Sequence, residues 1–321
     1  MVTDRTVLEN PSGELAASTA AYAVLAVPRP GVASWPNGPQ PGTVDLNTGA
    51  LRVYDLGLGT TYCILRSPDP TKLLVCQQYP PSQTTLILDL HSHVVKGLVG
   101  ASGFTSKPIG WTQRGIFFAS CEATCLNGGA SVLDPQTSAV MRITGDGYVS
   151  GVSPSGSFLG GAKNMYLGDS SSCNDSIFSI QLDWTTASGV PQGSWSPLVS
   201  QPNKDFKVLD IADDGSLLYT ESDCPPNGHS SPSPTSLYYF SGGRSTLQFG
   251  LGETADVFYM AAPQSPGLLL GRAVAVVARR PNGISEIDLV HLCTSDGCQP
   301  TVTTIAQGDR SIEGYAFSVL P

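Results

Sequence analysis

The sequence predicts an all-β fold built from repeated four-stranded antiparallel units. Short apolar runs alternate with tight turns along nearly the whole chain, and long helical patterns are nearly absent. The 35 glycines and 25 prolines among 321 residues are typical of many short strands joined by turns. With 40% apolar residues the chain can bury a sizeable core, which argues against intrinsic disorder.

The clearest hairpin signal lies in residues 147–168, where two apolar runs flank Ser153-Pro154-Ser155-Gly156. Proline presets φ at the first corner of a turn, and glycine accepts a positive φ. Related turns precede apolar strands at five other places: Asn10-Pro11-Ser12-Gly13, Ser67-Pro68-Asp69-Pro70, Thr112-Gln113-Arg114-Gly115, Asp213-Asp214-Gly215 and Pro263-Gln264-Ser265-Pro266-Gly267. The first turns of successive units recur at intervals of about 41 to 59 residues.

Each interval holds four predicted strands, except in a less regular first unit with strands at 22–27, 42–47 and 50–56. The second unit has strands at 60–66, 73–79, 84–90 and 94–100, and the third at 104–112, 116–123, 130–137 and 139–145. The fourth has strands at 148–153, 158–167, 176–184 and 194–200, and the fifth at 206–212, 217–223, 236–242 and 245–251. The sixth has strands at 256–262, 273–279, 285–292 and 301–307.

Four-stranded units at this period stack radially as the blades of a propeller. Residues 311–320 (SIEGYAFSVL) read as one more innermost strand, which completes the first blade by pairing the N- and C-terminal strands. We therefore expect a single β-propeller domain over residues 1–321 with six blades. A seven-bladed ring is the alternative, because residues 4–10 (DRTVLEN) also read as an inner strand.

Two kinds of turn carry a family resemblance. Inner strands end in Ser67-Pro68-Asp69, Ser153-Pro154-Ser155-Gly156 and Asp213-Asp214-Gly215, while Asp45-Leu46-Asn47-Thr48-Gly49 and Leu133-Asp134-Pro135-Gln136-Thr137 look like a D-x-x-T-G turn between third and fourth strands. In both respects the chain resembles the TolB-like and WD-repeat-like propeller families. The resemblance implies the propeller fold alone, since no Trp-Asp dipeptide ends a strand and the four tryptophans (35, 111, 184 and 195) are irregularly placed.

The eight cysteines form four predicted disulfides. Cys63 and Cys76 have their midpoint within the turn at 67–70, so an antiparallel hairpin places them opposite one another. Cys121 with Cys125, and Cys293 with Cys298, bracket short loops. Cys173 then pairs with Cys224 by elimination, each in a Ser-rich loop of successive units. Zinc bound by four thiolates is the rival, but the usual C-x-x-C knuckle is absent.

Eight cysteines that can all pair as disulfides are typical of a protein from an oxidising compartment. We therefore expect an extracellular or periplasmic protein whose signal sequence lies outside this chain. The apolar stretch 15–27 has 13 residues, and a membrane span needs about 20. It is also a poor signal peptide, because Asp4, Glu9 and Glu14 precede it against the single Arg5. We expect no membrane insertion.

The negative net charge argues against a nucleic-acid partner. With a net charge of −9 and Arg279-Arg280 as the sole adjacent basic pair, the chain lacks the clustered cations that phosphate binding needs. We expect a monomer that binds no nucleic acid.

Few residues carry candidate chemistry. Asp210, Asp256 and Glu313 fall on predicted innermost strands, where they line the central channel, and paired carboxylates can act as acid and base. His91-Ser92-His93 falls in an outer turn, and Ser153 before Pro154 is a turn former with no histidine placed to activate it. We assign no catalytic, cofactor-binding or metal-binding residue and expect no cofactor.

Two functions remain open. The favoured one is an extracellular, non-catalytic propeller that binds a protein or glycan through the loops of one face, because sequence length is concentrated in predicted loops at 28–42, 168–176, 185–197 and 222–235. The alternative is a secreted hydrolase, lactonase or lyase that uses channel carboxylates with a divalent metal. Fold alone does not decide between them.

Overall fold

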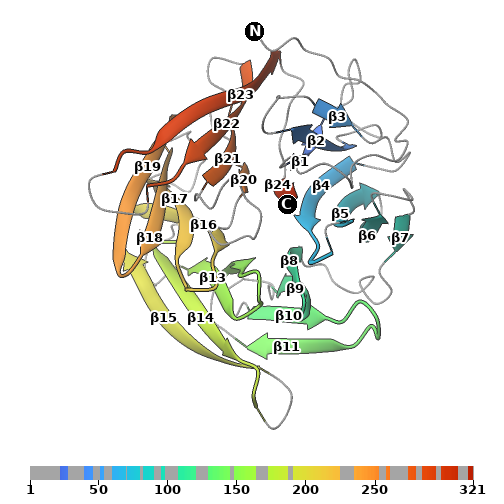
Figure 1. Cartoon of the computed structure of the whole chain (residues 1–321). Coiled ribbons are helices and arrows are strands. Elements are labelled where there is room, and N and C mark those ends of the chain that lie inside the picture. The colour runs from blue at the N-terminus through green and yellow to red at the C-terminus, as the bar shows by residue number, and fades with distance from the viewer. Residues whose placement is uncertain are drawn as a thin grey trace. The chain divides into compact units, whose positions relative to one another are not determined.

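The computed structural model consists of strands and turns, with no helix among the residues that it describes (Figure 1). It describes residues 22–27, 40–45, 51–53, 60–69, 71–79, 82–89, 95–97, 108–120, 129–144, 148–163, 173–186, 191–224, 235–252, 258–260, 274–279, 284–293, 298–309 and 317–320. The chain divides into two compact units. Unit 1 comprises Met1–Thr105, Asp256–His291 and Thr301–Pro321, and unit 2 comprises Ser106–Ala255 and Leu292–Pro300.

Unit 1 contains three four-stranded antiparallel sheets. The first joins the two ends of the chain, in the order β24 (Phe317–Leu320), β1 (Tyr22–Val27), β2 (Gln40–Asp45) and β3 (Leu51–Val53). The second comprises β4 (Thr60–Arg66), β5 (Lys72–Tyr79), β6 (Ser82–Asp89) and β7 (Val95–Gly97). The third comprises β20 (Phe258–Met260), β21 (Val274–Arg279), β22 (Ile284–His291) and β23 (Thr301–Asp309).

Unit 2 contains three further sheets of the same design. They comprise β8 (Pro108–Thr112), β9 (Gly115–Ser120), β10 (Gly129–Leu133) and β11 (Val140–Thr144); β12 (Tyr148–Val152), β13 (Phe158–Lys163), β14 (Ser176–Asp183) and β15 (Gln192–Ser200); and β16 (Lys204–Ile211), β17 (Leu217–Asp223), β18 (Thr235–Ser241) and β19 (Arg244–Gly252). In each of these three sheets of unit 2 the strands follow one another in chain order (Figure 1).

The prediction of four-stranded antiparallel units is confirmed throughout the described residues, and every strand predicted within the six units has a counterpart. Residues 4–10, the basis of the seven-bladed alternative, lie outside the described residues. The C-terminal strand pairs with the N-terminal one, Leu320 opposite Tyr22, as the sequence predicts. The loop predicted at 185–197 is wrong in its second half, because residues from Gln192 onward form β15. The strand predicted at 194–200 overlapped that loop, and the structure favours the strand, although β15 is mostly exposed and contains Pro197.

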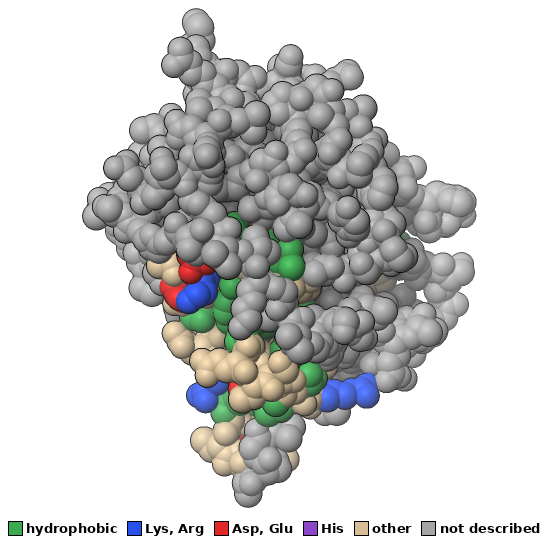
Figure 2. Space-filling model, turned by 90° about the vertical axis from the view of Figure 1, so that its right-hand side faces the viewer, with side chains coloured by type: hydrophobic (Ala, Val, Ile, Leu, Met, Phe, Trp, Pro, Cys, Tyr) green, Lys and Arg blue, Asp and Glu red, His purple; other side chains and the backbone are tan. Residues whose placement is uncertain are grey.

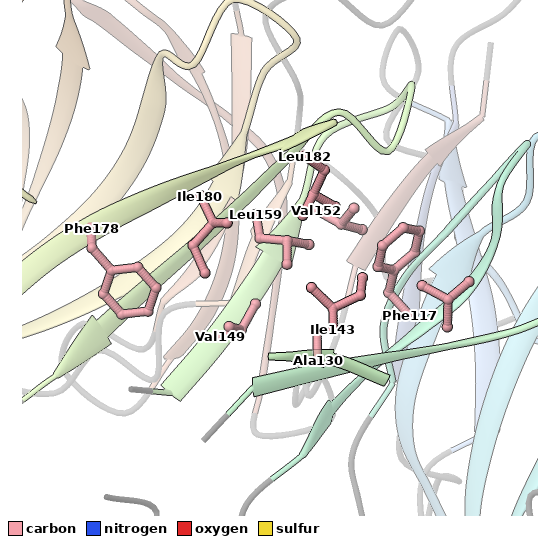
Figure 3. Close-up of a cluster of buried hydrophobic side chains, with 10 residues drawn as sticks. Phe117, Ala130, Ile143, Val149, Val152, Leu159, Phe178, Ile180 and Leu182 are labelled. Atoms are coloured by element: carbon pink, nitrogen blue, oxygen red, sulfur yellow. The ribbon is translucent and has the colours of Figure 1, made fainter. Parts of the chain in front are cut away.

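The core of unit 2 fills the seams between its sheets. One cluster joins the β8–β11 and β12–β15 sheets: Phe117, Ala130, Val132, Ile143, Val149, Val152, Leu159, Phe178, Ile180 and Leu182. Figure 3 shows side chains of the two sheets pointing toward one another in this cluster. A second cluster joins the β12–β15 and β16–β19 sheets: Ala162, Ile177, Phe206, Val208, Ile211, Leu217, Tyr219 and Phe240. Alternate residues of β14 therefore serve two different seams, as the period of a strand requires.

Candidate functional site

Of the three predicted channel carboxylates, the structure describes one. Asp210 lies on β16 at an irregularity of the β16–β17 pairing, is half-buried, and accepts a hydrogen bond from the Ile211 amide at 2.9 Å. Its backbone lies close to β12, since a Cβ built on Gly151 would be 3.5 Å from the Asp210 Cα. Asp256 and Glu313 lie outside the described residues, so a carboxylate pair stays a prediction.

Unit 2 has two ends that differ in chemistry. At one end, which we call the turn end, lie residues 112–115, 153–156, 184 and 213–215. Ser155 donates from its amide and its hydroxyl to Asp213 Oδ1, at 2.9 and 2.5 Å, and so links the turns of neighbouring sheets. The fully buried Ser153 hydroxyl accepts the amides of Ser157 and Phe158 at 3.2 and 3.0 Å. Ser153 therefore stabilises its turn, as the sequence predicts.

Trp184 holds the turn end together, and the sequence did not single it out for this role. Its indole Nε1 donates to the Gly156 carbonyl at 2.9 Å, and its ring packs edge-on against Phe117 at 6.3 Å between centroids. The Arg114 guanidinium lies 5.1 Å from the Trp184 ring centroid. Gly156 has φ of +72°, and an added Cβ would lie 3.0 Å from Thr112 Oγ1. Several polar groups of the turn end are thus hydrogen-bonded to one another.

At the opposite end, which we call the disulfide end, lie residues 173–175, 201–205 and 221–224. Cys173 is bonded to Cys224 with a Cα separation of 5.9 Å, the pair that the sequence argument reached by elimination. The backbone amide of Asn174 donates a hydrogen bond to Asp205 Oδ1 at 2.9 Å, and the backbone carbonyl of Asn174 accepts one from the Phe206 amide at 2.7 Å. The Cys224 amide donates to the Asn203 carbonyl at 2.9 Å, and Asn203 has φ of 63°.

Charged side chains gather at the disulfide end. Lys204 Nζ lies 3.1 Å from Glu221 Oε1 and 2.8 Å from Asp223 Oδ1, and the hydrogen bonds to Asp223 and Glu221 raise the pKa of Lys204. Burial raises the pKa of Asp205, against the opposing effects of the Asn174 amide and Lys207. The Lys204–Asp223 pair is partly exposed, with side-chain exposures of 25% and 69%, and a surface pair of this kind contributes about 0–1 kcal/mol.

Deeper in the same sheet, Tyr219 stacks on Tyr238 with 5.3 Å between ring centroids. Burial raises the pKa of Tyr219 to about 12, so its phenol stays protonated at physiological pH.

The other predicted disulfides have different outcomes. Cys293 is bonded to Cys298, with a Cα separation of 5.6 Å. The Cα of Cys63 lies opposite that of Cys76 in the β4–β5 register, and Cys76 is disulfide-bonded, so the 63–76 pairing fits the backbone. Cys121 and Cys125 lie outside the described residues, as do His91 and His93.

Gln248 is a second residue that the sequence did not reveal. It is buried, and its side-chain amide pairs with the backbone of Cys293: Nε2 donates to the Cys293 carbonyl at 3.1 Å, and Oε1 accepts from the Cys293 amide at 2.6 Å. The two residues are 45 positions apart, so no local pattern marks the contact.

Two observations on the described residues concern metal ligands and basic side chains. Within the described ranges, no group of three or more His, Cys, Asp or Glu could hold a metal ion. On the side that Figure 2 presents, the described surface is mostly uncharged, and its Lys and Arg side chains lie at separate points. Across the same part of the chain, no helix is long and apolar enough to cross a membrane.

Comparison with known proteins identifies the fold. No protein-family model matches the sequence, and no curated protein does. Among solved structures, TolB from Acinetobacter baumannii matches 93% of this chain and 66% of its own length, with a TM-score of 0.54 and 14% identity. The chain has a β-propeller fold similar to that of this TolB structure. A chain of a nidogen/laminin complex matches over 94% of this chain and 98% of its own, with a TM-score of 0.55 and 10% identity.

A protein from Lactobacillus plantarum also matches, over 94% of this chain and 100% of its own, with a TM-score of 0.51 and 12% identity. At these identities the likeness concerns the fold, and the propeller's blade count and ring closure stay predictions. The chain spans just under two thirds of the Acinetobacter TolB structure.

Proposed function

We propose that this propeller is an extracellular, non-catalytic scaffold that binds a protein or glycan partner through the disulfide end of unit 2. One observation carries the proposal: the two ends of unit 2 are held together by different means, hydrogen bonds at one and a disulfide at the other. The turn end is interlocked by Ser155, Asp213 and Trp184. The disulfide end holds segments of neighbouring sheets together covalently and carries the ion-paired group of Lys204, Glu221 and Asp223, in which the Asp223 side chain is 69% exposed.

A covalent link that holds two segments before a partner arrives reduces the ordering cost of binding. The structural likeness to a chain of a nidogen/laminin complex supports a protein partner, because that propeller-like chain is described in complex with another protein. The disulfides of unit 2 support an oxidising location, extracellular or periplasmic.

The test is a binding screen of the purified protein against secreted proteins and glycans, followed by charge reversal at either end. Asp223→Lys changes the disulfide end. Asp183→Lys is the control beside the turn end: Asp183 directly precedes Trp184, is exposed, and accepts hydrogen bonds from the Thr185 backbone amide and hydroxyl. We expect Asp223→Lys to weaken binding of a captured partner at least several-fold and Asp183→Lys to leave it unchanged. Equal losses in both variants would contradict the assignment of the surface. A substrate turnover abolished by Asp210→Asn would contradict the non-catalytic role.

A further inference from the structure

The disulfide end also contains the chain's sole acceptor triplet for N-linked glycosylation. Asn174-Asp175-Ser176 is the one Asn-X-Ser/Thr sequence in which X is not proline, since Asn10-Pro11-Ser12 is blocked by Pro11. Asn174 is half-buried and directly follows the disulfide-bonded Cys173. Its main chain makes the two hydrogen bonds described above, and no hydrogen bond between described residues uses its side-chain amide.

The rest of the triplet is closed off in the folded protein. Asp175 is 6% exposed and Ser176 is 1% exposed. The Ser176 hydroxyl lies 2.9 Å from the Ser200 hydroxyl, and the Asp175 carbonyl accepts from the Gln201 amide at 3.0 Å. An enzyme that must read an extended Asn-X-Ser segment cannot do so once these contacts exist, so any glycan has to be attached before this part of unit 2 folds.

The contacts that close the triplet come from later parts of the chain. Ser200, Asp205 and Cys224 lie 24 to 51 residues beyond the residues they hold. At a synthesis rate of about 5–20 residues per second, the chain needs roughly 2–10 s to proceed from Ser176 to Cys224. Until Ser200 is synthesised, about halfway through that interval, β15 cannot pair with Ser176, and the strand already present beside it is β13. An isolated two-stranded hairpin of this kind is marginally stable at best.

We propose that Asn174 is N-glycosylated during synthesis, before the Cys173–Cys224 disulfide closes. The inference rests on the extracellular location proposed above and requires a eukaryotic secretory pathway. The co-substrate is a polyprenyl pyrophosphate-linked oligosaccharide. A bond forms between Asn174 Nδ2 and the first sugar carbon, the bond from that carbon to the phosphate oxygen breaks, and the lipid pyrophosphate leaves as the amide loses a proton. The attached glycan would lie beside the proposed binding surface, so binding has to be measured with and without it.

The test is expression behind a cleavable signal peptide in a eukaryotic host, with analysis confined to protein recovered from the medium. Intact-mass measurement before and after glycosidase treatment, with peptide mapping, gives the occupied fraction at Asn174. We expect the secreted protein to lose the mass of one glycan on treatment, and Asn174→Gln to carry none. Cys224→Ser keeps the triplet and prevents closure of the disulfide, so its occupied fraction should equal or exceed that of the unaltered protein. Cys298→Ser, which breaks the other disulfide described in unit 2, should leave the fraction unchanged.

An unmodified Asn174 in the secreted protein would overturn the inference, whether or not Cys224→Ser became modified. A fall in occupancy in Cys224→Ser would overturn the proposed order, because transfer would then depend on the closed disulfide. Neither result bears on partner binding, which the unmodified protein can still show.

Discussion

Removing the Cys173–Cys224 disulfide should be the most destabilising loss of a single cross-link in unit 2. The bond closes a loop with a sequence separation of 51, whereas Cys293–Cys298 spans a separation of 5. In the chain-entropy model these separations correspond to about 4 and about 2 kcal/mol of stabilisation through the unfolded state. For a chain of 321 residues that unfolds in one transition, 4 kcal/mol corresponds to a decrease in Tm of about 6 °C.

The assay is reversible thermal and denaturant unfolding of Cys173→Ala/Cys224→Ala beside Cys293→Ala/Cys298→Ala. Alanine pairs avoid an unpaired thiol and the burial of a serine hydroxyl at Cys173, which is 5% exposed. The first variant should lose about twice as much free energy of unfolding as the second. A loss no larger than that of the Cys293/Cys298 variant would refute the reasoning, because loop length would then not govern the stabilisation.

Three further predictions concern stability. Gly156→Ala should destabilise by about 1–3 kcal/mol, because φ is positive there and the new Cβ meets Thr112 and Arg114; Gly242→Ala, with positive φ but no neighbour within 4 Å, should cost less in the same denaturant titration. Asp205→Asn should remove a pH dependence of stability. Burial raises the Asp205 pKa, so the folded state binds the proton more tightly, and the unaltered protein should gain stability as pH falls through that raised value. Calorimetry should not find this gain in the variant. Asp69 should act in the opposite direction, because hydrogen bonds from Lys72 and then Thr71 lower its pKa to about 2. The stability that Asp69 contributes above about pH 4 should be lost between pH 4 and 2, and Asp69→Asn should lack that contribution. An identical acid profile for the variant would show that the Asp69–Lys72 pair does not contribute.

Local pattern was enough to predict the strands and turns. The hairpin at Ser153-Pro154-Ser155-Gly156 lies where its proline and glycine require, with Gly156 at positive φ. The turn at 133–137 has Asp134 accepting the Gln136 amide at 2.7 Å and the Thr137 hydroxyl at 2.7 Å, the D-x-x-T arrangement that the sequence suggested. Such turns depend on residues within a few positions of one another, so their chemistry can be read directly from the chain.

The pairing of Cys173 with Cys224 and that of the terminal strands β1 and β24 also followed from the sequence, although both are distant in the chain. In each case a repeat supplied the missing information. Equivalent loops of successive units carry the two cysteines, and the first unit lacked an inner strand that the C-terminus had in excess. Repetition turns a long-range question into a comparison of equivalent positions.

The all-β class, the four-stranded units, the strand positions and the cysteine pairing now seen at Cys173–Cys224 and Cys293–Cys298 could all be predicted from the residues alone. The polar partners became known from the folded chain: Trp184 with Gly156, Gln248 with Cys293, and Asp205 with Asn174. The folded chain also showed that one end of unit 2 is interlocked and the other held by a disulfide. The physical reason is that turn and strand preferences act between near neighbours, whereas a hydrogen bond between sheets depends on how separate strands pack, which no short stretch of residues encodes.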